Sequence, residues 1–126
     1  MRARDGHQYF LEKDREWRQA AEGVRYTAFM TDSNDRSRPL NVLSEYPPNH
    51  SVDPHTHDSD YTEIVIEGEL TVGKMHLVRG DVRVMKGGVG YGPLVSGPQG
   101  CRVLTIFDRA DGSLTRWLGG GQPKPA

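Results

Sequence analysis

The segment from Pro54 to Leu70 constrains the fold more than any other part of this 126-residue chain. It opens with His55 and His57, and side chains two residues apart on an extended strand point to the same face. Glu63 stands at even spacing from both histidines, so it shares their face if the backbone stays extended without a bulge. Two imidazoles and one carboxylate are a common ligand set for a divalent transition metal. The segment therefore predicts a strand with a metal site on one face.

The rest of the chain indicates an all-β domain. It holds 15 Gly and 8 Pro, and nine of the glycines lie between Gly68 and Gly100, which suits short strands joined by tight turns. Apolar Val82 and Val84 share one face of a short run of β formers. Residues 90–100 are expected to form a loop. We expect strands over residues 24–30, 40–46, 69–72, 75–78, 82–85 and 101–107.

The chain is long enough for a single closed core and too short for two. We divide it into an N-terminal arm (1–23), one barrel (24–118) and a flexible Gly- and Pro-rich tail (119–126). The arm is strongly charged and is expected to contain a short helical turn. Its Trp17 is expected to plug one end of the barrel or a subunit interface.

Charge and cysteine content limit the classes of partner. Lys and Arg number 16 against 17 acidic residues, so nothing favours binding to nucleic acid or to an anionic membrane. The partner that this composition favours is a small molecule. One cysteine, Cys101, excludes an internal disulfide and is expected to be buried. No run approaches the roughly 20 apolar residues of a membrane span, and a cytoplasmic location is the default expectation.

The histidine segment resembles the first motif of the cupin family, in which a His-x-His pair is followed by Glu and then by a Gly that turns the chain. His55, His57 and Gly68 match this pattern. Counting back from Gly68 places the family's Glu position on Tyr61, so Glu63 stands one or two places late. The usual carboxylate position therefore holds a tyrosine.

A second region resembles the other cupin motif, which is Gly-Asp, four residues, Pro-x-Gly, two residues and His. Gly80 and Asp81 match its start, whereas Tyr91 stands where the family has its last metal-ligating histidine. The two motifs together cover residues 47–107. Two tyrosines at two ligand positions indicate a site that has changed in kind.

The resemblance implies a double-stranded β-helix, or jelly-roll barrel, that forms a homodimer. It also implies a barrel pocket for a divalent metal (iron, manganese, nickel or zinc) and a small organic substrate, as in a dioxygenase, isomerase or lyase. His55 and His57 would ligate the metal, Glu63 would be the third ligand or a general base, and Tyr61 and Tyr91 would orient the substrate. The alternatives are a non-catalytic cupin that binds a small molecule at a degenerate metal site, and a purely structural dimer.

Four further residues keep alternative roles at this stage. Tyr91 is a phenolate ligand, a hydrogen-bond donor or a packing residue, and the donor role is favoured because phenol titrates near pH 10. His50 lies in the break before the motif and is a weaker candidate ligand. His76 and His7 are expected to face solvent.

Overall fold

The computed structural model of the protein describes residues 2–4, 6–20 and 23–118. The predicted tail, residues 119–126, lies outside the described residues. The strands are β1 (Arg2–Arg4), β2 (His7–Tyr9), β3 (Arg18–Gln19), β4 (Arg25–Met30), β5 (Leu40–Tyr46), β6 (Ser51–Val52), β7 (His55–Thr56), β8 (Tyr61–Val72), β9 (Met75–Val78), β10 (Val82–Met85), β11 (Leu94–Phe107) and β12 (Arg116–Trp117). Two 3₁₀ turns complete the described elements, η1 (Glu12–Asp14) and η2 (Ala110–Gly112). The all-β prediction is confirmed.

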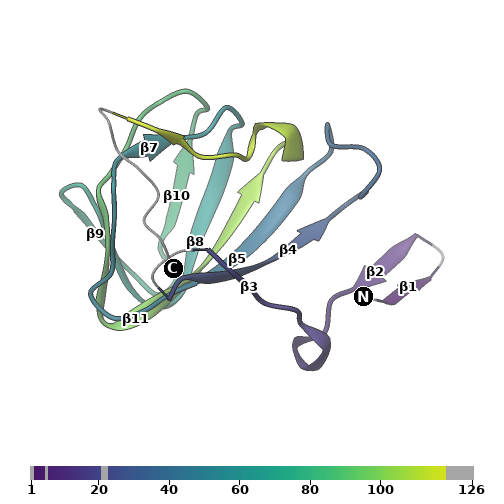
Figure 1. Cartoon of the computed structure of the whole chain (residues 1–126), viewed down its shortest axis with the longest axis horizontal. Coiled ribbons are helices and arrows are strands. Elements are labelled where there is room, and N and C mark those ends of the chain that lie inside the picture. Colours follow the sequence, from purple (N-terminus) through teal and green to yellow (C-terminus); the bar gives the residue numbers. More distant parts are fainter. Residues whose placement is uncertain (1, 5, 21–22, 119–126) are drawn as a thin grey trace.

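The main sheet has the antiparallel order β10-β8-β11-β5-β4-β3, with β9 added beside β8 and β6 beside β11. Its strands curl around one interior, and β7 and β12 lie across one end of the barrel (Figure 1). The hairpin of β1 and β2 extends away from the barrel beyond β4, at the right of the view (Figure 1). No helix in the described part of the chain is long and apolar enough to cross a membrane.

Two long strands, β8 and β11, pass from one side of the barrel to the other by bending at glycines. Gly68 has φ +75° and Gly100 has φ +79°, and the register of the two strands shifts beside them. The prediction that Gly68 ends a strand in a turn is therefore wrong, because the glycine bends a continuous strand. The loop predicted over residues 90–100 is also wrong from Leu94 onward, where β11 begins.

Replacing Gly68 with alanine should lower the free energy of unfolding by about 2 kcal/mol or more. A Cβ at Gly68 would lie 2.2 Å from the carbonyl oxygen of Gly100, in addition to the strain of a positive φ. Gly80→Ala is the matched control, since Gly80 also has a positive φ but no heavy atom within 4 Å of the added carbon. Urea denaturation of both variants tests this, and equal losses would contradict the close approach at Gly68.

The apolar core fills the part of the barrel below the histidines. Cys101 belongs to it, as predicted, and burial raises the pKa of its thiol to about 12, so it stays a neutral packing residue. The core cluster consists of Val65, Leu70, Leu77, Leu94, Cys101 and Val103.

The N-terminal arm lies against the outside of the sheet. Its Phe10 packs edge-on against Phe29 of β4, with ring centroids 4.9 Å apart. The ring of Trp17 lies 4.2 Å from the guanidinium carbon of Arg25 and 5.8 Å from that of Arg102. Trp17 thus stacks on arginines of β4 and β11, and its predicted interface role stays untested.

Candidate functional site

His55 of the first motif lies in a short ladder at the end of the barrel that β7 and β12 cross, and His57 follows directly after β7 ends at Thr56. His55 pairs with Tyr91 on one side and with Trp117 of β12 on the other. The ring centroid of His55 is 4.6 Å from that of Tyr91 and 5.4 Å from that of Trp117. Only 5% of His55 and 7% of His57 is exposed. The segments around Tyr91 and Trp117 therefore enclose both imidazoles.

Both imidazoles direct their Nε2 atoms at one hydroxyl group. The hydroxyl oxygen of Tyr91 lies 2.7 Å from Nε2 of His55 and 3.0 Å from Nε2 of His57. On the far side of each ring, Nδ1 lies 2.9 Å from a backbone carbonyl oxygen, that of Asp53 for His55 and that of Ser113 for His57. The same arrangement therefore holds each ring at both of its nitrogens.

These contacts fix the tautomers. A carbonyl oxygen can only accept a hydrogen bond, so both Nδ1 atoms carry the proton and both neutral rings present a bare lone pair at Nε2. Tyr91 has one hydroxyl proton and can satisfy one lone pair only. The other buried acceptor lacks a donor, which costs about 1–3 kcal/mol. One further proton, or one cation, is therefore needed to satisfy both Nε2 lone pairs.

Burial keeps this cluster neutral. It lowers the pKa of His55, although the hydrogen bond to the Asp53 carbonyl acts in the opposite direction. Burial likewise lowers the pKa of His57, and the neighbouring His55 lowers it further. Burial also raises the pKa of the Tyr91 phenol. Protonation of an imidazole at neutral pH therefore does not supply the missing proton.

In the metal-free protein, the two histidines should make stability fall on acidification. Because their folded-state pKa values are lowered, the unfolded chain binds more protons below its ordinary histidine pKa of about 6.5, so stability is full above that pH and declines below it. Urea denaturation at pH 7.5 and 5.5, with a chelator present, measures the slope. The double variant His55→Ala/His57→Ala should lose part of it, and an unchanged slope would contradict this assignment.

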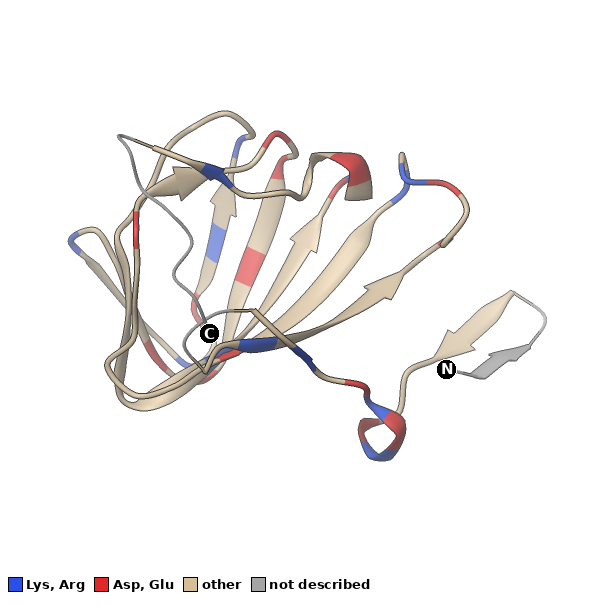
Figure 2. Cartoon of the chain, viewed as in Figure 1, with Lys and Arg blue, Asp and Glu red and all other residues tan. Residues whose placement is uncertain are grey.

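Glu63 points into the barrel, as predicted, but an arginine holds it. Arg83 of β10 donates to Oε1 of Glu63 from Nε at 3.2 Å and from a terminal nitrogen at 2.9 Å, and to the Tyr61 hydroxyl at 3.3 Å. The side chains of Arg83 and Glu63 are 12% and 6% exposed. This buried ion pair joins β10 to β8, where blue and red bands lie side by side in Figure 2.

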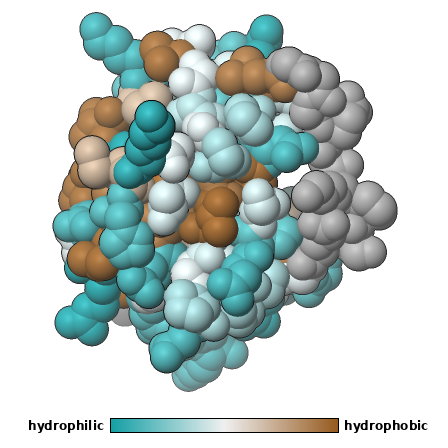
Figure 3. Space-filling view, turned by 90° about the vertical axis from the view of Figure 1, so that its left-hand side faces the viewer, coloured by the Kyte–Doolittle hydropathy of each residue, from teal (hydrophilic) through white to brown (hydrophobic). Residues whose placement is uncertain are grey.

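The inward position of Arg83 reverses the usual burial pattern of β10. Val82 and Val84 share one face, as predicted, but that face is turned to solvent, with 55% and 74% of the residue exposed. Burying each valine would stabilise the fold by about 1.5–3 kcal/mol, and a one-residue shift in register would achieve that burial. Figure 3 shows apolar side chains at the surface on the side of the barrel formed by β9 and β10.

The donor set fits a metal ion only in part. Two bare imidazole nitrogens that face one point, each with its other nitrogen bound to a carbonyl, are typical of histidine ligands. Across residues 6–20 and 23–118, however, no three His, Cys, Asp or Glu side chains are grouped so that they could hold a metal. Glu63 is engaged by Arg83, so its role as third ligand stays a prediction. The oxygen atom at the meeting point belongs to Tyr91.

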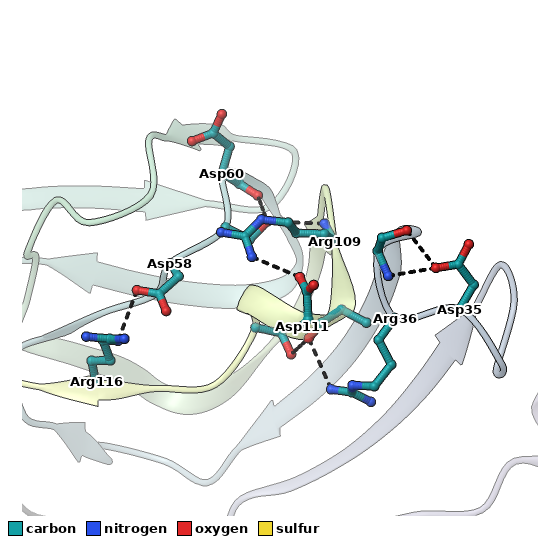
Figure 4. A network of polar contacts seen from close by, with 11 residues as sticks. Asp35, Arg36, Asp58, Asp60, Arg109, Asp111 and Arg116 are labelled. Carbon is teal, nitrogen blue, oxygen red and sulfur yellow. Dashed lines mark hydrogen bonds and ion pairs between the residues drawn. The ribbon is translucent and has the colours of Figure 1, made fainter.

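A strap of residues 113–118 closes this end of the barrel. Its Ser113 carbonyl orients His57, and the amide of Leu118 donates to the Pro54 carbonyl at 3.1 Å. Arg116 forms an ion pair with Asp58 at 2.9 Å, while Asp111 pairs with Arg109 at 2.8 Å (Figure 4). The strap is therefore held at both ends and positions one of the two imidazoles.

The five predicted site residues come together. The His57 and Tyr61 rings are 5.3 Å apart, and the Tyr61 and Tyr91 rings are 5.9 Å apart. Three other candidates lie elsewhere or face solvent: His76 is exposed and bonded to Glu69, His7 is exposed, and the backbone amide of His50 is bonded to Ser96. The five predicted residues therefore lie close together, and their chemical roles stay predictions.

Sequence reasoning missed Arg83, Ser113 and Trp117. The alternation of Val82, Arg83 and Val84 places the arginine on the face opposite the valines, but it does not say which face is inside. Ser113 acts through its backbone carbonyl, which no residue type signals. Trp117 reaches His55 by a long-range pairing that local patterns do not encode.

Comparison with known proteins shows the fold. No family model and no curated protein matches the chain. Among solved structures, the polyketide cyclase RemF of Streptomyces resistomycificus superposes with a TM-score of 0.74 at 19% identity, over 93% of this chain and 89% of that one. An RmlC-like cupin of Shewanella frigidimarina gives 0.70 at 19% identity, over 82% and 92%. Oxalate decarboxylase of Bacillus subtilis gives 0.69 at 16% identity, over 90% of this chain but 34% of its own.

These neighbours have a common architecture, and the curled antiparallel sheet of this chain follows it. The protein has the cupin fold, a double-stranded β-helix, as the two sequence motifs predicted. At these identities the likeness concerns the fold, and chemistry must be argued from the site.

Proposed function

We propose that the protein is a metal-dependent cupin enzyme that acts on a small organic substrate, with His55 and His57 as metal ligands. The observation that carries this proposal is the pair of bare Nε2 lone pairs that face a single hydroxyl proton. A divalent transition metal accepts both lone pairs at once and removes the deficit of the buried cluster.

The residues of the chain have distinct tasks in this proposal. The carbonyls of Asp53 and Ser113 hold the two rings in the tautomer that ligation requires. When both Nε2 atoms bind the metal, the Tyr91 hydroxyl no longer donates to an imidazole. It is then free to donate to a substrate oxygen. Tyr61, beside it, is the second candidate for orienting the substrate. A bound metal would supply Lewis-acid polarisation of a substrate oxygen or activation of dioxygen.

Glu63 keeps two candidate tasks, third ligand and general base. Either one requires its carboxylate to loosen from Arg83, because Oε1 accepts both arginine hydrogen bonds. Two structural neighbours, a polyketide cyclase and an oxalate decarboxylase, are named as enzymes, which supports an enzyme of the dioxygenase, isomerase or lyase class.

The alternative is a cupin that binds a small molecule without turnover. The ion pair between Glu63 and Arg83 favours it, because that pair engages the carboxylate that was predicted as the third metal ligand. The two hypotheses predict different metal contents for the purified protein.

Metal analysis tests the proposal directly. Protein purified without added metal should contain close to one transition-metal ion per chain by elemental analysis, and cobalt(II) titrated into chelator-treated protein should give visible absorption bands that saturate at one equivalent. A folded protein that contains no metal and gives no cobalt spectrum would overturn the enzyme proposal in favour of the alternative.

We also propose that two copies pair through the outer face of the main sheet. The cross-strand partners Val82, Ile64, Leu104 and Leu43 form an apolar row across four strands on that face. The arm covers it incompletely, leaving a groove of about 520 Å³. The groove is lined by Phe10, Glu12, Arg15, Phe29, Asn41, Leu43, Ile66, Arg102 and Leu104.

Leu104→Glu should convert a dimer into a monomer, because it places a charge in the middle of this apolar row. Light scattering after gel filtration should give the mass of two chains for the wild type and of one chain for the variant. Val95→Glu, which changes a 36% exposed residue near the other end of β11, should leave the dimer intact. A monomeric wild type would refute the pairing.

A further inference from the structure

Arg83 stands inside the barrel although the sequence around it favours the opposite register. The turn before β10 helps to fix that register: the Asp81 carboxylate accepts from the Val78 amide at 2.9 Å, and the Val65 amide donates to the Asp81 carbonyl at 3.1 Å. Places where a chain violates its own burial pattern are expected to be functional. The inward guanidinium is such a place.

The Arg83 guanidinium has more N–H groups than its described neighbours accept hydrogen bonds from. Arginine carries five N–H groups, and Glu63 and Tyr61 account for three of the Arg83 donors. Two N–H groups, one on each terminal nitrogen, have no acceptor among the residues that the structure describes. They belong to a side chain that is only 12% exposed. Such donors call for an acceptor that the described part of the chain does not provide.

Arg83 also lies next to the histidine cluster. Its guanidinium carbon is 4.4 Å from the ring centroid of Tyr91 and 5.5 Å from that of Tyr61. The hydroxyl of the same Tyr91 is the one that both imidazoles face. A ligand group on Arg83 would therefore lie one tyrosine ring away from the point where the two Nε2 atoms converge.

We propose that Arg83 is the recognition residue for the carboxylate of a small organic acid, which makes the substrate class an organic anion. This inference rests on the proposed function for the presence of a substrate in the barrel, but not on the metal. The guanidinium already holds a carboxylate, that of Glu63, through two N–H groups, so the planar geometry suits this group. A neutral amide or ester gains much less from the same donors.

Glu63 and the ligand compete for one guanidinium in this arrangement. The incoming carboxylate takes the two remaining donors, and replacing Glu63 with a neutral residue should strengthen its attraction to Arg83. If Arg83 served only to neutralise Glu63, that replacement would weaken the fold without changing which ligands bind.

The test compares acids with their amides on chelator-treated protein. Acetate, malonate, benzoate and salicylate are titrated against acetamide, malonamide, benzamide and salicylamide, with calorimetry for affinity and the ¹⁵N–¹H signal of Arg83 Nε for location. At least one acid should bind 10-fold or more tightly than its amide and shift that signal. The proposal is overturned if no acid exceeds its amide, or if inorganic phosphate binds more tightly than every acid.

Variants make the assignment specific to Arg83. Glu63→Gln should tighten binding of the preferred acid about 5-fold or more. The double variant Glu63→Gln/Arg83→Gln, which leaves no unpaired charge, should remove the preference for acid over amide. Arg109→Gln, which removes an arginine whose partner Asp111 lies outside the barrel, should change neither. Retained preference in the double variant would overturn the proposal.

Failure of this inference and failure of the metal proposal are distinguishable. The acid titrations use metal-free protein and report on Arg83, whereas elemental analysis and cobalt titration report on His55 and His57. A protein that binds metal but does not distinguish acids from amides would retain its proposed class and lose only the assigned substrate class.

Discussion

Replacing His55 and His57 together with alanine should weaken divalent metal binding by at least about 100-fold. Changing a residue that merely supports a ligand typically costs 10–100-fold, and this variant removes both of the proposed imidazole ligands. The protein should stay folded, because the apolar core lies lower in the barrel, around Val65 and Val103. Cobalt titration and elemental analysis of the purified variant measure the loss.

His76→Ala is the matched control for this experiment. It also removes one imidazole, but from an exposed position beside Glu69. Metal content should stay at the wild-type level in this variant. Stoichiometric metal in the double-alanine variant would show that the ion binds elsewhere and would remove the basis of the proposed enzyme.

Replacing Glu63 with leucine should lower the free energy of unfolding by about 3–5 kcal/mol. The change leaves the Arg83 guanidinium in the barrel without its counter-charge, and removing one partner of a buried ion pair carries a cost of this size. Urea denaturation in metal-free buffer measures it. A loss below about 1 kcal/mol would mean that water reaches the pair freely.

The paired variant Glu63→Leu/Arg83→Met separates charge from packing. Replacing both partners of a buried pair by apolar residues of similar volume is often neutral or stabilising, so this variant should recover most of the loss. If it proves as unstable as Glu63→Leu alone, the two side chains do not interact energetically in solution.

Alternation and turn residues were sufficient to predict the short strands. The strands predicted over residues 40–46, 75–78 and 82–85 have the same bounds as β5, β9 and β10. The two long strands were predicted as shorter pieces, because Gly68 and Gly100 read as chain breaks in the sequence. Whether a glycine ends a strand or bends it depends on the neighbouring strand, which in this case approaches to contact distance.

The candidate site was predictable where a motif supplied residue types. The His-x-His pair, with the tyrosines at the other family positions, led to residues that the structure brings together, and their role as a site stays a prediction. The position of Arg83 was not predictable, because local hydrophobicity favours burial of Val82 and Val84. In the structure the Glu63 carboxylate faces this arginine, which the histidine motif does not indicate.

The carbonyl that orients His57 belongs to Ser113, 56 residues further along the chain. At about 5–20 residues per second, the ribosome needs about 3 to 11 s to add those residues after it has made His57. During that interval the ring is free to adopt either tautomer. We therefore expect the nascent chain to bind the proposed metal ion only after the strap has been synthesised and has docked, so that metal binding is a late event in the maturation of the protein.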